Sequence, residues 1–578
     1  MDTSSTSMMS AEKETSHVTA SNKSALLGVS DGQEFSQSDA LSFSSFRRGT
    51  VDPRTGSFNY AIPVARITGN RRRGPSLDLV LKHNHFSSRN EGFGAGWSLG
   101  LSKFFKDNDR MKLLLRDGRI IDLIEKNGTY LVETVDLKNF ILTKLASPEK
   151  GYKISYKDGS TEILKSVTSD DRFIYVTEII QEDGYKLNIE YTFRESVSPS
   201  PFVKRITDEL GEELLLVSRT GLNSRYNVTI ETFKNISKLA CKLILTVKES
   251  ASNSIEYCLA VSNKSTNILT FTYQQGTYFR LITKVESNFF GPATEIINYD
   301  IPLTAPLGSP VGSFPAVSSY QFTMVSPVTG QISTEEYKYS YGESIWSNNF
   351  LGNNGVTAWD KNAIDNIYAC PADYTYFAQE TLWIDNLEEY KNKFTYDKYH
   401  RVIKEEVSAS RVVAPVLAQT ITTKYIYQGN TSAKYSSLPA TYKLPVSIKK
   451  DYFEKDSEDS HIRSESSSFT YDQYGNIETS TDSGGISMDY IYYPAAGVTG
   501  KCPKDKNGFV RYLHSSNKYQ NDMSVDSIEN TYTYLAMQVK VGYDYVVENS
   551  ETERKIISMH WSDNSKETTK TYYGMEEV

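Results

Sequence analysis

Two histidines spaced two residues apart are the most direct candidate for metal chemistry. His83 and His85 lie on one face of a predicted strand, since alternate side chains of a strand point the same way, and this spacing can hold a metal ion. No third ligand is visible nearby, and the other histidines show no H-E-x-x-H pattern. The letters His-Asn-His also do not make a nuclease motif, which extends over a larger metal-binding unit. We therefore expect a pair of solvent-facing strand histidines.

Two glycine patterns could carry a nucleophile or a phosphate group. Residues 28–32 match the G-x-S-x-G elbow, but no apolar strand precedes them and no helix-forming run follows. The four glycines of residues 92–100 do not fit G-x-G-x-x-G, and a phosphate cradle needs the amino terminus of a helix behind it. The sequence predicts instead a glycine-rich bend that lets Phe93 and Trp97 pack closely on other strands.

The charged and sulfur-containing residues also indicate no site. Arg71, Arg72 and Arg73 stand beside glycines, which is typical of a solvated loop tip. The four cysteines form no C-x-x-C pair and are expected to be free thiols. With 63 Lys and Arg against 71 Asp and Glu, the net charge is −8, which argues against a strongly basic nucleic-acid binder. We expect no catalytic, cofactor-binding or metal-binding residue, and a protein that is not an enzyme.

The sequence predicts that the histidines, the glycines of residues 92–100, the arginines and the cysteines named above lie on β-strands or in the turns and loops between them. Tyrosine, a strand former, contributes 40 of the 578 residues. Between about 111 and 300, alternating apolar runs are separated by Asp-Gly or Asn-Gly pairs, which favour type I′ hairpin turns. The best helical window is 381–392, and it is a poor one. The sequence therefore predicts an all-β fold, a long curved antiparallel sheet of successive hairpins. The Asp-Gly and Asn-Gly pairs lie in residues 116–119, 126–129, 157–160 and 182–185.

Composition divides the chain into four predicted segments. Residues 1–42 are rich in Ser, Thr, Gln and Asp and are expected to form a disordered arm. Residues 43–300 form an amino-terminal β-hairpin region. Residues 301–335 hold five prolines and three glycines and are expected to be a connection. Residues 336–578 form a tyrosine-rich β-region.

Tyrosines recur two residues apart in the second half of the chain, as at Tyr425 and Tyr427 or Tyr490 and Tyr492. Residues with this spacing lie on one face of a strand. Such ladders can stack across strands and seal a sheet. Alternatively, exposed rings can stack on sugars or on a passenger chain. We favour the structural interpretation and keep the binding interpretation open.

Two segments, 394–402 and 469–477, share the pattern aromatic-Thr-Tyr-Asp-x-Tyr. The carboxylate of Asp472 is expected to accept backbone N–H groups two residues on, in an Asx-type turn, and Gly475 to supply the left-handed position. His400 stands where the first copy would need that glycine, so its turn is expected to differ. The predicted repeat-forming residues, all structural, are Phe394, Tyr396, Asp397, Phe469, Tyr471, Asp472, Gly475 and Asn476.

These segments resemble the YD repeat of the rearrangement-hot-spot (RHS) family. Residues 281–300 look like a divergent copy, and 51–56, 92–99, 349–352 and 502–512 look like segments of bacterial RHS-repeat proteins. The resemblance implies a strip of a hollow shell. The copies are sparse, and neither the closing core segment nor a toxin domain of that family is visible, so self-cleavage and toxicity are not carried over.

The resemblance implies a non-enzymatic encapsulating module of an RHS-type toxin or effector, which sequesters or presents a passenger polypeptide. The expected partners are that toxin passenger or a second shell subunit that covers the exposed sheet edges. The alternatives are a β-repeat protein that binds carbohydrate or a cell surface, an enzyme whose site no local motif marks, and a remnant of a longer ancestor.

The amino terminus lacks the apolar stretch of a signal peptide, and no run approaches the roughly 18 apolar residues of a membrane span. We expect synthesis in the cytoplasm and, for a secreted effector, a dedicated export system.

Overall fold

The computed structural model describes residues 49–85, 90–107, 110–132, 137–168, 174–193, 200–222, 225–233, 241–249, 255–261, 267–276, 279–288, 291–343, 347–352, 357–410, 418–455, 460–520, 526–540, 543–559 and 562–571. Its regular structure consists of antiparallel strands and three short 3₁₀ turns, which confirms the all-β prediction. The predicted arm, residues 1–42, and the glycine pattern at 28–32 lie outside the described residues.

A small four-stranded sheet opens the fold. Its strands pair in the order β1-β2-β3-β4, and a turn stabilised by Asp52 joins the first two: the Arg54 amide donates to Asp52 Oδ1 at 2.9 Å. Gly56 closes this turn at φ 69°, and its carbonyl accepts the Val317 amide at 2.9 Å. The four strands are β1 (Gly49–Asp52), β2 (Ser57–Thr68), β3 (Ser76–His83) and β4 (Trp97–Ser98).

A second, much longer sheet forms a wall. Its first strands are β5 (Lys103–Asp107), β6 (Arg110–Leu114), β7 (Ile120–Lys126), β8 (Thr129–Val132), β9 (Phe140–Lys144), β10 (Gly151–Tyr156), β11 (Thr161–Ser166), β12 (Ile174–Ile180), β13 (Lys186–Thr192), β14 (Phe202–Asp208), β15 (Glu213–Leu222), β16 (Arg225–Thr232), β17 (Cys241–Glu249), β18 (Ile255–Val261), β19 (Asn267–Gln275), β20 (Arg280–Ser287), β21 (Ala293–Asn298), β24 (Ser319–Val325) and β25 (Ile332–Tyr341).

The wall continues with β26 (Thr375–Ile384), β27 (Leu387–Asp397), β28 (Val402–Ala409), β29 (Ala418–Tyr427), β30 (Pro445–Lys455), β31 (Ser460–Tyr471), β32 (Ile477–Thr481), β33 (Ile486–Tyr492), β34 (Leu513–Gln520), β35 (Asp526–Lys540), β36 (Tyr543–Met559) and β37 (Ser562–Thr571). A separate hairpin, β22 (Ile301–Thr304) and β23 (Ser313–Ala316), lies between β21 and β24. The 3₁₀ turns are η3 (Asn70–Arg72), η4 (Asn366–Ala369) and η5 (Tyr435–Ser437).

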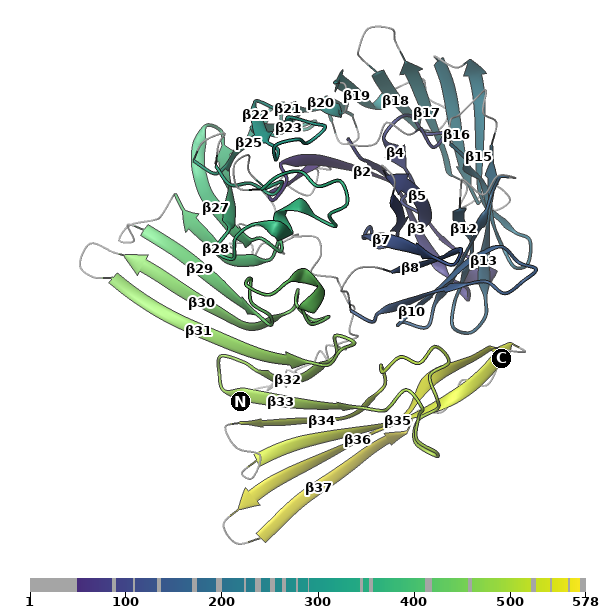
Figure 1. Ribbon diagram of the computed structural model, residues 1–578, viewed down its shortest axis with the longest axis vertical. Helices are drawn as coiled ribbons and strands as arrows, with labels where there is room; N and C mark the ends of the chain where they lie inside the picture. Colours follow the sequence, from purple (N-terminus) through teal and green to yellow (C-terminus); the bar gives the residue numbers. More distant parts are fainter. Residues whose placement is uncertain are drawn as a thin grey trace, which may run out of the picture.

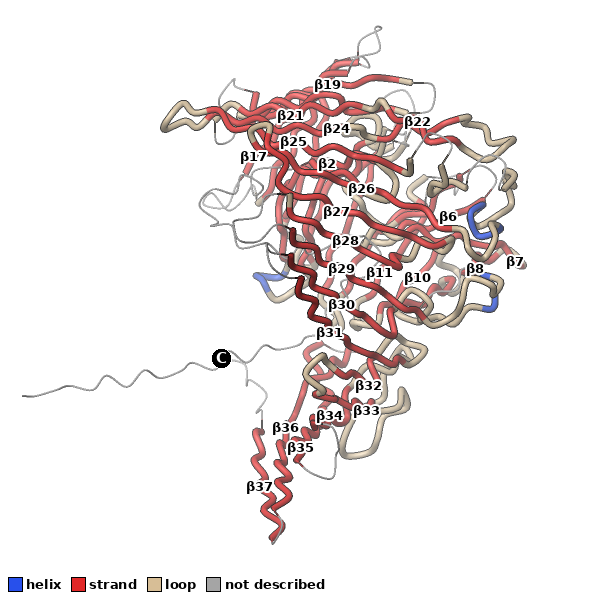
Figure 2. The backbone as a smooth tube through the Cα atoms, turned by 90° about the vertical axis from the view of Figure 1, so that its left-hand side faces the viewer, coloured by secondary structure: helices blue, strands red, loops and turns tan. Residues whose placement is uncertain are grey.

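The wall curls around the small sheet. Figure 1 shows strands β15 to β31 following an arc with β2 to β5 inside it, and Figure 2 shows the strands from β19 to β33 stacked one below the next. Nearly every strand pairs with its sequence neighbours, and an extra bridge from Tyr175 to Lys103 links β12 to β5. Among the described residues, β37 pairs with β36 alone.

The main hydrophobic core lies between the small sheet and the wall. Tyr60 packs edge-on against Phe271 with ring centroids 4.9 Å apart, and Trp97 meets the same ring at 5.2 Å. Phe58 contacts Tyr320 at 5.4 Å. Aromatic pairs of this geometry add to the free energy of burial. The small sheet thus fills the inside of this part of the wall and holds its curvature.

Most Asp-Gly turns differ from the predicted type. Gly118, Gly159 and Gly184 have positive φ, but the aspartates before them do not, so these are not type I′ turns. Each aspartate instead accepts an amide two residues on, as Asp158 does from Ser160 at 2.9 Å, which favours a type I turn followed by a left-handed glycine. Asn127-Gly128, with φ of 52° and 67°, has the predicted type I′ values.

Two further expectations need correction. The weak helical window, 381–392, is the turn of the β26–β27 hairpin, with Asp385 and Asn386 both at positive φ. Residues 301–335 are not only a connection, because they hold the β22–β23 hairpin, strand β24 and the start of β25. The prolines of β22 and β23 sit on that small hairpin, outside the ladder of the wall.

Candidate functional site

One face of the wall carries most of the aromatic residues of strands β27 to β33, and we call it the inner face. It is the face on which Phe394 and Tyr396 of β27 lie, both buried in the main core. Strand pairing assigns further residues to this face, because paired residues point to the same side of a sheet. Phe394 pairs with Glu405, Tyr425 with Ile448, and Ser480 with Met488. Beyond β27 its rings are only half-buried. They are Tyr425, Tyr427, Tyr452, Phe469, Tyr471, Tyr490 and Tyr492.

The outer face of the same strands is mostly polar, with the exposed isoleucines Ile426, Ile462 and Ile491 among its polar side chains. Lys393 faces Glu406, and Thr422 faces Asp451. Hydroxyl groups bond across it, as between Thr470 and Thr479 at 2.8 Å. The alternation of aromatic and polar side chains thus gives this part of the wall two chemically different faces.

Tyrosine follows seven of the twelve register shifts between described strands of the wall. Such bulges bend a strand and increase its twist. The sequence showed the tyrosine spacing but not this link to the bulges. The seven tyrosines are Tyr191, Tyr273, Tyr396, Tyr427, Tyr471, Tyr492 and Tyr534.

Several of these hydroxyl groups are bound by the wall itself. Tyr191 donates to the Val176 carbonyl at 2.9 Å, and Tyr427 to the Val402 carbonyl at 2.8 Å. Tyr471 donates to the Pro445 carbonyl at 3.1 Å. Each bond ties a strand end to a neighbouring strand. This favours the structural interpretation of the tyrosine ladders.

The two tyrosine–aspartate turns are built alike. Asp472 Oδ1 accepts the amides of Tyr474 and Asn476 at 2.8 and 2.9 Å, and Oδ2 accepts Asn476 Nδ2 at 2.7 Å. Gly475 takes the left-handed conformation at φ 75°. These are the hydrogen bonds that the sequence predicts for an Asx-type turn.

The first copy has the same turn although His400 replaces glycine. Asp397 Oδ1 accepts the amides of Tyr399 and Arg401 at 2.9 and 3.1 Å, and Oδ2 accepts Arg401 Nε at 2.7 Å. His400 adopts φ 60°, so the expectation of a different turn is wrong. Its ring compensates for the backbone strain: Nδ1 lies 2.7 Å from the Tyr376 hydroxyl and Nε2 lies 2.8 Å from Asp365 Oδ2.

Tyr376, His400 and Asp365 are arranged like a catalytic triad, but they are not accessible to a substrate. Burial lowers the pKa of His400, against the opposing effect of Asp365. Burial also raises the pKa of the Tyr376 hydroxyl. A working triad has the same two hydrogen bonds, so the difference is accessibility: the Tyr376 side chain, which carries the hydroxyl, is only 3% exposed and a substrate cannot reach it. The arrangement acts as a clamp on the turn.

Residues 502–512 contain a third turn of this kind, which the sequence patterns did not reveal. Asp505 Oδ1 accepts the amides of Asn507 and Phe509, both at 2.9 Å, and Oδ2 accepts Arg511 Nε at 2.7 Å. The signal was present, because Asp505 and Gly508 have the same Asp-x-x-Gly spacing as Asp472 and Gly475, and Gly508 is also left-handed at φ 80°. No tyrosine precedes Asp505, which hid the likeness.

The expectation of solvent-facing histidines at 83 and 85 is wrong. His83 and His85 are 4% and 3% exposed, because His83 packs on Trp97 of β4 and Tyr273 of β19 and His85 packs on Phe314. Burial, with smaller effects of His85 and Arg280, lowers the pKa of His83 to about 3. Burial lowers the pKa of His85 to about 4. The described residues contain no group of three or more His, Cys, Asp or Glu side chains placed to hold a metal ion.

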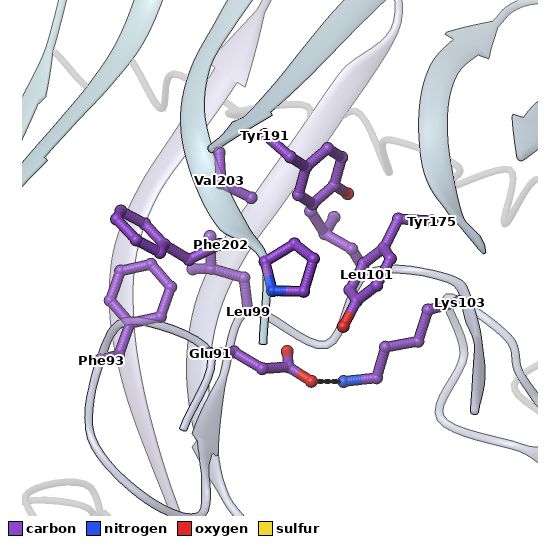
Figure 3. A pocket seen from close by; sticks show the side chains of 10 residues that line it. Glu91, Phe93, Leu99, Leu101, Lys103, Tyr175, Tyr191, Phe202 and Val203 are labelled. Atoms are coloured by element: carbon purple, nitrogen blue, oxygen red, sulfur yellow. Dashed lines mark hydrogen bonds and ion pairs between the residues drawn. The ribbon is translucent and has the colours of Figure 1, made fainter. Parts of the chain in front are cut away.

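A small cavity lies beside the glycine-rich bend. Figure 3 shows Glu91 paired with Lys103, with Tyr175, Tyr191 and Phe202 around them. Its volume is about 20 Å³, which is room for one water molecule and not for an organic ligand. Phe93 and Trp97 are both 2% exposed, and a Cβ on Gly92 would overlap the Phe202 ring at 2.6 Å. The bend therefore serves close packing, as predicted.

Other predicted features have plain structural roles. Arg71, Arg72 and Arg73 are exposed around η3, as expected of a loop tip. Cys370 and Cys502 are free and buried. In the part of the chain that is described, no helix has the length and apolar character needed to cross a bilayer.

Comparison with known proteins does not establish a family. No family model matches the chain, and no curated protein does. Solved structures that match include TcdB2-TccC3-TEV, with 8% identity and a TM-score of 0.27, covering 88% of this chain and 42% of that one.

Two more matches have similar values. TcdB2-TccC3 without its hypervariable C-terminal region has 9% identity and a TM-score of 0.27, with 88% of this chain and 42% of that one covered. A Tc holotoxin pore of Photorhabdus luminescens has 8% identity and a TM-score of 0.26, with 87% and 35% covered. The chain spans less than half the length of the chains it matches.

Proposed function

We propose that this chain is a non-enzymatic shell module of an RHS-type toxin or effector, which sequesters or presents a passenger polypeptide. The observation that carries the proposal is the change along the inner face at β27. Up to Phe394 and Tyr396 the face is buried against the chain's own core, and from β28 onward the same aromatic face is half-buried. A face of this composition needs a further surface to cover it.

The unpaired side of β37 is evidence for a partner chain. Strand β37 pairs on one side with β36, and among the described residues nothing pairs with its other side. An open strand edge presents unpaired N–H and C=O groups to another strand. A second shell subunit, or another copy of this chain, would continue the ladder.

The absence of enzymatic activity is part of the proposal. Its support is the burial of the titratable clusters: Tyr376 beside His400 is 3% exposed, and His83 and His85 are buried among aromatic rings. The recurring carboxylates Asp397, Asp472 and Asp505 are engaged in backbone turns.

Size-exclusion chromatography with light scattering on the purified full chain tests the proposal. We expect a particle heavier than the 65.2 kDa chain, because the open edge and the half-buried face favour association. Hydrogen exchange of β29 to β33 should slow as this particle forms. A compact 65 kDa monomer whose β29 to β33 amides are already fully protected would contradict it.

Carbohydrate binding is the second candidate, favoured by the ring of Tyr490 on the half-buried inner face. A glycan array would detect it as saturable binding that Tyr490→Ala removes. Tyr519 lies on the outer face of β34 and is also half-buried, so Tyr519→Ala is the matched control. Binding that survives both substitutions equally would exclude this face as the sugar site.

A further inference from the structure

Turns at the lower end of the first half of the wall meet turns of the second half. Glu182, in the β12–β13 turn, is paired with Arg511, and its carbonyl accepts Lys506 Nζ at 3.2 Å. Arg511 is itself held by Asp505 at 2.7 Å. The two partners of the Glu182–Arg511 pair are 16% and 13% exposed, so solvent screens this pair less than a surface pair.

Two neighbouring turns repeat the pattern. Lys540, at the end of β35, pairs with Glu209 of the β14–β15 turn and donates to the Gly184 carbonyl at 3.3 Å. Lys157, in the β10–β11 turn, donates to the Tyr474 carbonyl at 3.0 Å. Lys138 donates to Gln473 Oε1 at 2.9 Å.

We call this set of contacts the seam. Its partners are 317 to 356 residues apart in sequence, and the seam joins strand ends from β9 to β15 with strand ends from β31 to β36. In Figure 1 it lies where β10 approaches the lower strands β33 to β35. These contacts are hydrogen bonds and ion pairs, and two apolar side chains also cross the seam, since Leu137 lies against Gly475 and the Tyr543 ring against Gly184.

The seam differs from the rest of the wall in having no large apolar core behind it. The main core ends at β27, and the second half has two small clusters of its own, one around Tyr399 and Tyr442 and one around Tyr493 and Tyr512. Separating the two halves at the seam therefore exposes charged and polar groups, which water can solvate, and leaves the main core intact.

We propose that the seam is a polar latch, at which the wall formed by β28 to β37 opens and closes against the first half while the core around β1 to β4 stays folded. The bend line is the β27–β28 boundary, where the core ends. In the shell proposed above, such a latch would give a passenger or partner chain access to the inner face, and in that respect it rests on the proposed function. Opening is a property of the isolated chain and can be measured without any partner.

Reversing the charges of one ion pair at the seam tests the latch. Glu209 and Lys540 are 28% and 33% exposed, so both should tolerate substitution. Glu209→Lys places two cations together, and we expect hydrogen exchange of residues 182–185 and 505–511 to rise about tenfold while β20 and β24 keep their protection. The double variant Glu209→Lys/Lys540→Glu restores an opposite-charge pair, and exchange should return to near the wild-type rate.

Glu190→Lys is the matched control. Glu190 pairs with Arg205 inside the β13–β14 hairpin and lies away from the seam contacts, so its variant should leave exchange at 182–185 unchanged. On the unaltered chain, 1 M NaCl should raise exchange at the seam because salt screens the more exposed Glu209–Lys540 pair.

Two results would overturn the latch. One is seam exchange that does not respond to salt in the unaltered chain. The other is seam exchange that rises only together with that of β20 and β24, since this would mean global unfolding. Neither result depends on whether a passenger binds, so failure of the latch and failure of the shell proposal are separable.

Discussion

A single aspartate organises each tyrosine–aspartate turn. Its contribution to stability depends on whether its removal leaves a buried partner without a hydrogen bond. Asp397 is buried with Arg401, whose Nη1 also donates to the Gly429 and Tyr442 carbonyls at 2.9 and 3.2 Å. Asp472 is half-buried and bonds to backbone amides and an asparagine. The two copies of one motif should therefore differ in sensitivity.

Alanine substitution of these aspartates measures that difference. Asp397→Ala leaves Arg401 buried without its carboxylate and should lower the free energy of unfolding by about 3–5 kcal/mol. Asp472→Ala should cost about 1–2 kcal/mol, the usual loss of turn hydrogen bonds. Urea unfolding gives both values. An Asp472→Ala variant as stable as the parent would refute the turn role of that residue.

The buried histidines make the fold acid-sensitive. Folding lowers the pKa of His83 from about 6.5 to about 3 and that of His85 to about 4, so the unfolded chain binds more protons below pH 6.5. Stability should be full above pH 6.5 and fall as the pH decreases, by roughly 2 kcal/mol for each histidine between pH 6.5 and 5.

Urea unfolding at pH 7.5 and pH 5.0 checks this expectation. The double variant His83→Gln/His85→Gln should be less stable at pH 7.5 but show a much smaller loss on acidification. Equal losses in both proteins would show that other groups, such as His400, dominate the acid response.

Sequence could predict that His83 and His85 share a strand face but not which face. That choice depends on tertiary packing, because His83 packs on Trp97 of the small sheet and on Tyr273 of the distant wall strand β19. The Asp472 turn was accessible because its hydrogen bonds are local. The Asp365 and Tyr376 partners of His400 were not, because they come from a loop and a strand that precede it by 35 and 24 residues.

At the scale of elements, hairpin turns determine where each strand of the wall ends and the next begins. The Asp-Gly signals correctly predicted the hairpins at 116–119, 157–160 and 182–185 but indicated the wrong turn type at each. The reason is physical: an aspartate carboxylate that accepts the amide two residues on favours a negative φ for the aspartate, and only the glycine is left-handed.

A pair of glycine substitutions tests this turn geometry. Gly118 has φ 88° and open space where a Cβ would lie, so Gly118→Ala should cost about 1–2 kcal/mol from backbone conformation alone. Gly312 also has open space but no positive φ, so Gly312→Ala should leave stability unchanged or raise it by up to about 1 kcal/mol. Thermal unfolding of the two variants compares them directly. Equal effects would contradict the assigned turn.

Bulges bend the strands of the ladder into a curved wall, and seven of the twelve between described strands precede a tyrosine. The spacing of the tyrosines was visible in the sequence, and their position on one face followed from it. The bulges were not predictable, because a register shift depends on the partner strand, as between Ile426 and Tyr427 against β30. Sequence therefore indicates the strands and their faces, while the pairing determines the bend.

The whole molecule is a long antiparallel wall curled around a small sheet of its own. The sequence indicated successive hairpins, but nothing in it predicted that β1 to β4 would lie inside the curve, because their alternation is that of any half-buried strand. The small sheet fills the first half of the wall, and the second half has an aromatic face that the described chain leaves half-buried.

Cryo-electron microscopy of the purified full chain tests the proposed shell role most directly. We expect a curved wall with β1 to β4 inside its first half, and a second polypeptide, either another copy or a partner, that covers the inner face of β28 to β34 or extends the ladder at β37. A lone compact particle in which β28 to β37 fold back on the first half and fully bury Tyr425, Tyr471 and Tyr490 would contradict the account.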